Sequence, residues 1–92
     1  MREVDEKAVR LLREGRVTRN ERDACYRVLG FSGKLYVVLV GTWGGTCTCQ
    51  AGEHSGQLKL SEVVDRGCSH LLAALVLAHH ELPEVREAVN AE

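Results

Sequence analysis

Three cysteines and one histidine are the residues of this chain with the clearest capacity for chemistry. Cys47 and Cys49 are separated by one residue, an 18-residue gap follows, and Cys68 and His70 are again separated by one residue. Three thiolates and one imidazole are a ligand set that zinc takes in closed, tetrahedral sites. The residue types therefore predict one structural Zn²⁺ per chain, bound by Cys47, Cys49, Cys68 and His70.

The two ligand pairs need different backbone conformations to reach one ion. In an extended chain, residues two apart point to the same side, so the first pair can bind an ion from the end of a strand. On a helix, residues two apart are rotated by about 200°. Cys68 and His70 can therefore share an ion only if Cys68 precedes a helix and His70 lies in its first turn. Gly67 permits the required bend, and Ser69 is a good N-cap.

Other interpretations of these residues stay open. His54 can replace His70 as a ligand, because it follows Cys49 by only five positions. Cys47 and Cys49 can instead form a redox pair, although the redox motif with a known setting is C-x-x-C near a βαβ unit. The cysteines can also be small buried residues, which is what we expect of the isolated Cys25.

Three segments have the apolar pattern of helices. Residues 3–14 and 83–92 each carry one apolar stripe. Residues 69–82 are apolar nearly all round, so we expect this main helix to be buried on several sides or covered by a partner. His79 and His80 lie near its end, where positive charge is favoured.

The remaining segments predict a hairpin and its connections. Residues 24–29 and 34–40 are rich in aromatic and β-branched side chains and are joined by a glycine-containing turn, which predicts two antiparallel strands. We expect a charged linker or turn over 16–23, a short edge strand over 58–60 and a helical turn over 61–66. The fold class is therefore α+β, a small ββα unit with a flanking helix on each side.

The overall composition is that of one small globular domain of 92 residues, with 45% hydrophobic residues and a net charge of −1. A core of this size is marginal, and small folds often add a metal. A strongly basic nucleic-acid footprint is absent. The N-terminus has no signal-peptide pattern, and the longest apolar run, 71–78, is shorter than the roughly 20 residues that span a bilayer. We expect an intracellular protein of the cytoplasm, nucleoid or nucleus, where reduced thiols favour metal over disulfides.

The hairpin, the C-x-C pair, the C-x-H pair and the helix after it resemble a SWIM zinc finger, whose pattern is C-x-C, a variable gap and C-x-H on a ββα scaffold. The resemblance implies the same four zinc ligands named above. It also implies three parts of the chain, namely an N-terminal helix and charged linker (1–23), the SWIM-like finger (24–82) and a short C-terminal helix (83–92).

SWIM domains occur in chromatin ATPases, Mutator-type transposases, some ubiquitin ligases and small proteins that partner RecA-like recombinase paralogues. A chain with little beyond the finger is most similar to the last group. The resemblance implies a non-enzymatic accessory module of DNA recombination or repair that binds a protein partner, as a homodimer or hetero-oligomer. A thiol-redox or zinc enzyme is a weaker alternative.

Direct, sequence-nonspecific DNA binding is the other alternative. It would use basic and aromatic side chains near the finger, namely Arg16, Arg19, Arg22, Arg27, Lys34, Trp43 and Arg66. Trp43 could stack on a base, although a lone tryptophan in a small domain more often fills the core.

Overall fold

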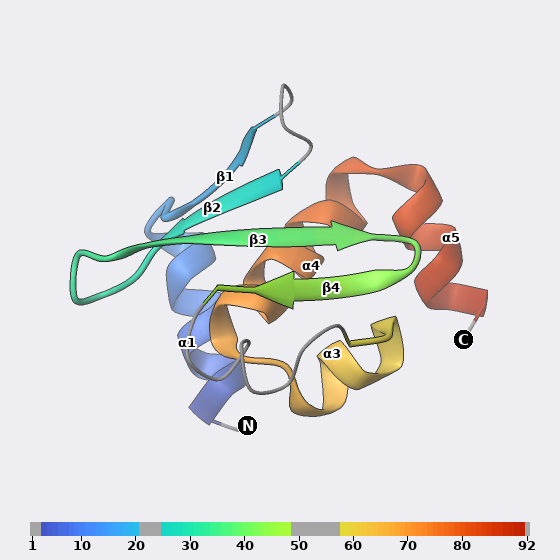
Figure 1. Cartoon of the computed structure of the whole chain (residues 1–92), viewed down its shortest axis with the longest axis horizontal. Coiled ribbons are helices and arrows are strands. Elements are labelled where there is room, and N and C mark those ends of the chain that lie inside the picture. Colours follow the sequence, from blue (N-terminus) through green and yellow to red (C-terminus); the bar gives the residue numbers. More distant parts are fainter. Residues whose placement is uncertain (1–2, 21–24, 49–57, 92) are drawn as a thin grey trace.

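The fold is a four-stranded antiparallel sheet with the main helix packed on one face, a small α+β arrangement (Figure 1). A computed structural model describes residues 3–20, 25–48 and 58–91. The strands are adjacent in chain order and are β1 (Val17–Asn20), β2 (Cys25–Leu29), β3 (Leu35–Gly41) and β4 (Gly44–Cys47). The helices of this part of the chain are α1 (Glu3–Arg13), α3 (Leu60–Arg66), α4 (Ser69–Glu81) and α5 (Pro83–Ala91). None of these helices is long and apolar enough to cross a membrane.

The sheet has one buried face and one exposed face, because side chains alternate along each strand. Val28 of β2 and Val38 of β3 belong to the buried face and are fully covered. The opposite face carries four large apolar side chains that are 40% to 54% exposed, namely Leu29, Leu35, Val37 and Leu39. We refer to these four residues as the outer apolar face.

Helix α4 forms the centre of the core, which explains why its sequence is apolar nearly all round. Its buried residues are Leu71, Ala73, Ala74, Leu75 and Ala78. The helix lies behind the sheet, between α1 and α5, and contacts both (Figure 1). Among its large apolar side chains only Val76 is exposed. The chain itself therefore covers this helix, and the exposed apolar surface lies on the sheet instead.

The prediction of a linker or turn over 16–23 is wrong, because Val17–Asn20 forms strand β1. It pairs antiparallel with β2, and Val17 lies opposite Val28. The strand is at the edge of the sheet, and its two middle residues are exposed. Polar side chains are tolerated there, so long-range pairing decides the conformation rather than local propensity. Residues 21–23 of the predicted linker lie outside the described residues.

A further strand, β4, begins at Gly44, beyond the strand that the sequence predicts over 34–40. It pairs with β3, and a single bridge joins Gly45 to Leu58 on its other side. A Cβ on Gly45 would lie 2.6 Å from Leu71 Cδ1, so a larger residue there would displace this buried side chain of α4. The edge strand predicted over 58–60 is reduced to that one bridge.

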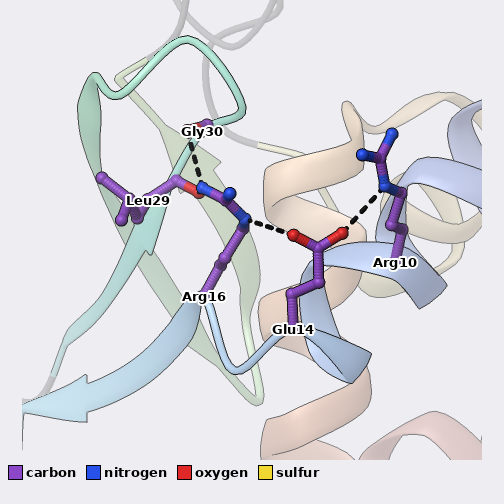
Figure 2. Close-up of polar contacts among 5 residues, drawn as sticks. All are labelled: Arg10, Glu14, Arg16, Leu29 and Gly30. Carbon is purple, nitrogen blue, oxygen red and sulfur yellow. Dashed lines mark hydrogen bonds and ion pairs between the residues drawn. The ribbon is translucent and has the colours of Figure 1, made fainter.

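A carboxylate between two arginines holds the corner where α1 leads into β1 (Figure 2). Glu14 Oε2 accepts a hydrogen bond from Arg10 Nε at 2.8 Å, and Glu14 Oε1 accepts one from Arg16 Nε at 3.0 Å. Arg16 Nη1 also donates to the Gly30 carbonyl oxygen at 3.1 Å, which ties the corner to the β2–β3 turn. The hydrogen bond from Arg16, followed by that from Arg10, lowers the pKa of Glu14 below its ordinary value of 4.5.

We expect Glu14→Gln to reduce the loss of stability in acid. Because the native pKa is lowered, the carboxylate contributes stability that is fully present above pH 4.5 and is lost as the pH falls through the native pKa. Thermal unfolding from neutral pH down through this range measures the difference. The matched control is Glu3→Gln at the start of α1, where the carboxylate contacts one lysine at 3.3 Å. It should retain the wild-type profile, and identical profiles for Glu14→Gln and wild type would contradict the prediction.

Candidate metal centre

Strand β4 places Cys47 on the buried side of the sheet. Cys47 lies opposite Val38 of β3 and is 5% exposed. The next residue fixes the strand end, because the Thr48 N–H donates to the Val37 carbonyl oxygen (3.1 Å) and Thr48 Oγ1 accepts from the Val37 N–H (3.0 Å). The predicted position of Cys47 at the end of a strand is confirmed.

The second ligand pair lies where α3 ends and α4 begins. The Gly67 N–H donates to the Val63 carbonyl oxygen at 3.0 Å, and a Cβ on Gly67 would lie 2.6 Å from that oxygen. Cys68 is the N-cap of α4, and its Sγ accepts a hydrogen bond from a backbone N–H of the first turn at 3.4 Å. His70 lies in that turn, as helix geometry predicts. The cap is thus Cys68 and not the expected Ser69, because the sulfur takes the acceptor role that a serine oxygen usually fills.

Three of the four predicted ligands converge. One ligand atom from each of Cys47, Cys68 and His70 lies within 4.8 Å of the other two. In a tetrahedral site with metal–sulfur distances of about 2.3 Å, two sulfurs are about 3.8 Å apart. The three ligand atoms would therefore need to move only slightly closer together to bind one ion. The positive end of α4 also favours negative thiolates at this position.

The imidazole of His70 is positioned by Tyr36 of β3. The two rings are stacked, with centroids 4.2 Å apart and planes 28° apart. Nδ1 of His70 is buried and has no hydrogen-bond partner among the residues that the structure describes. Leaving a buried polar atom unpaired is unfavourable, and a metal ion bound at this nitrogen would pair it. The donor set and the unpaired nitrogen both fit a metal ion.

The remaining cysteines and histidines either lie outside the described residues or are not part of this group. Cys49 and the alternative ligand His54 lie outside the described residues. Cys25 is buried at the start of β2 and is not part of the group, which confirms its prediction as a small buried residue. His79 and His80 lie at the C-terminal end of α4 and do not belong to the group either.

Of the residues that the DNA-binding hypothesis names, Lys34 and Trp43 lie at opposite ends of one strand. Lys34 precedes β3 and Trp43 follows it, so a seven-residue strand of roughly 23 Å separates them. Arg27 is exposed on β2, between two buried neighbours, and the side chain of Arg66 is outside the described part. The expectation that Trp43 fills the core is wrong. It is 45% exposed, because the chain turns back into β4 immediately after it.

The remaining arginines of the DNA-binding hypothesis either form ion pairs or lie outside the described residues. Arg16 Nε contacts Glu14 at 3.0 Å, and Arg19 Nη1 contacts Glu81 at 3.8 Å. Arg22 lies outside the described residues. These ion pairs neutralise charge that a phosphate backbone would otherwise contact.

The arrangement as a whole can hold a metal ion between the end of a strand and the start of a helix. Its three residues come from β4 and from the α3–α4 junction, which are distant in the sequence and adjacent in the fold. An ion there would link the sheet to the central helix. Comparisons of the chain with models of protein families, with curated proteins and with solved structures found no match.

Proposed function

We propose that the chain is a zinc-dependent interaction module of the SWIM type. The observation that carries the proposal is the convergence of Cys47, Cys68 and His70 within 4.8 Å. Cys49, two residues after Cys47, completes a Cys₃His set in this proposal. A zinc with four protein ligands has no open position, so its role is to stabilise the fold rather than to catalyse a reaction.

The outer apolar face supports the proposal that the module binds a protein. Its residues lie on paired strands, with Leu29 directly opposite Leu35. Contiguous apolar patches of this kind on globular domains often mark interaction sites. In this proposal the module is an accessory subunit of DNA recombination or repair, and its partner is a RecA-like recombinase paralogue, as the resemblance implies.

Zinc-edge X-ray absorption, with native mass spectrometry for stoichiometry, tests the ligand set. We expect one zinc per chain with three sulfurs and one nitrogen in the first shell. Two sulfurs, one nitrogen and a water oxygen would indicate an open position, which is typical of catalytic zinc, and would overturn the structural role. Cys49→Ser is the control for the fourth ligand, because it should lower the sulfur count by one.

A further inference from the structure

A cavity of about 370 Å³ lies between the end of the sheet and the α4–α5 junction. Figure 1 shows the β3–β4 turn, which supplies part of its lining, beside α5. The apolar part of the lining includes Val40, Leu82 and Val85, and the polar part includes Arg19, Tyr26 and Glu84. None of the three residues of the metal group belongs to the described lining.

A buried phenol in this lining lacks a hydrogen-bond partner. Tyr26 is 2% exposed, and its hydroxyl has no partner among the described residues. Burial raises the pKa of Tyr26 above its ordinary value of 10.0, and the Glu81 carboxylate adds to the effect. The phenol is therefore protonated at neutral pH, and its oxygen can still accept a hydrogen bond. A ligand that donates to this oxygen would relieve the unfavourable burial.

The charged groups around the cavity favour a cation. Arg19 contacts Glu81 at 3.8 Å, whereas Glu84 takes part in none of the ion pairs found among the described residues. Glu81 lies outside the described lining, but it neutralises Arg19, so Glu84 is the lining charge left for a ligand. Trp43 adds an exposed aromatic surface and lies close against Gly41, where a Cβ would be 2.6 Å from the indole Nε1. An aromatic surface in the same lining as a carboxylate that forms none of the described ion pairs is a typical environment for a bound cation.

We propose that this cavity binds the guanidinium group of an arginine side chain presented by a partner protein. A guanidinium is planar, stacks on aromatic rings and has five forked donors. It stacks on Trp43 and donates to the Tyr26 oxygen and the Glu84 carboxylate. The aliphatic stem lies against Val40 and Leu82. A lysine ammonium has neither the flat surface nor the forked donors. The inference is independent of the zinc proposal, because it uses none of the metal group.

Fluorescence titration of the full chain tests this proposal, because its single tryptophan lines the cavity. The probe is the peptide acetyl-Gly-Arg-Gly-amide, and the matched control carries citrulline, which has nearly the same shape without the charge. We expect a saturable change with the arginine peptide and about tenfold weaker binding of the citrulline peptide. Equal binding of the two would overturn the proposal. Butylguanidinium has only the stem and head, and binding as tight as that of the peptide would indicate a small-molecule site and exclude the protein partner.

Two variants test the assigned contacts. Glu84→Gln should weaken binding of the arginine peptide about tenfold, whereas Glu87→Gln, on the same helix but outside the described lining, should change it less than about twofold. Tyr26→Phe removes only the hydroxyl. Because that hydroxyl has no described partner, the melting temperature should be unchanged while binding weakens about fivefold. A lower melting temperature with unchanged binding would show that the hydroxyl serves the core, and would overturn its role as an acceptor.

Discussion

Replacing Cys68 by serine is expected to abolish the proposed zinc binding and to lower the melting temperature of the domain by about 20 °C. Serine keeps an oxygen that can cap α4, so the start of the helix is preserved and the loss reports mainly on the metal. The metal group lies between β4 and α4, and a chain of 92 residues has only a small core to hold these elements together without it.

The size of the effect follows from mass action. A ligand present at 1,000 times its dissociation constant stabilises the folded state by about 4 kcal/mol. In a domain of this size, about 1 kcal/mol shifts the melting temperature by about 4–8 °C. Thermal unfolding followed by circular dichroism, with and without a chelator, measures the shift. The chelator should lower the melting temperature of the wild type by a similar amount and have no further effect on Cys68→Ser.

Cys25→Ser is the matched control, since it makes the same change at a buried thiol outside the metal group. It should retain one zinc and its response to chelator, and lose about 1–3 kcal/mol because a hydroxyl is buried in place of a thiol. If chelator leaves the melting temperature of the wild type unchanged, zinc has no structural role, whatever the variants do.

Much of the candidate metal centre is predictable from local sequence. The division of Cys68 and His70 across a helix start follows from 3.6 residues per turn, and the structure has this arrangement. The stack of Tyr36 on His70 does not follow from a local rule, because it depends on how α4 packs on the sheet. Alternation along β3 does place Tyr36 on the same face as the buried Val38, which is the signal that could have indicated it.

The fold is predictable from the sequence where the apolar periodicity is strong. It is not predictable where pairing with neighbouring strands decides the conformation of a segment. Helices α1, α4 and α5 and the β2–β3 hairpin have clear patterns, and all of them are present. Strand β1 is polar and β4 is half glycine, and both become strands through their neighbours in the sheet. The sequence therefore predicts a hairpin and a short edge strand over 58–60, whereas the described part of the chain forms the four strands β1 to β4. The wrong expectation that Trp43 fills the core has the same origin. Because strand β4 is not predicted, the turn between β3 and β4 that contains Trp43 is not predicted either.

Gly44→Ala is expected to lower the free energy of unfolding by about 3–5 kcal/mol. Gly44 has a φ of +126°, and a Cβ there would overlap the carbonyl oxygen of Leu58 and lie 3.0 Å from the Cα of Lys59. These are backbone atoms, so no side-chain rotation relieves the contact. The strand would have to move away, which would break the two hydrogen bonds between Gly45 and Leu58, of 2.9 and 3.0 Å. Urea unfolding measures the loss.

Gly33→Ala separates the effect of this contact from that of the backbone angle. Gly33 also has a positive φ, of +90°, but nothing lies within 4 Å of a Cβ built there, so its replacement should destabilise by only about 1–2 kcal/mol. Because Cys47 follows Gly44 on the same strand, Gly44→Ala should also weaken zinc binding, whereas Gly33→Ala should not. If both variants are equally mild, β4 does not need this close approach, and another feature must position Cys47 against α4.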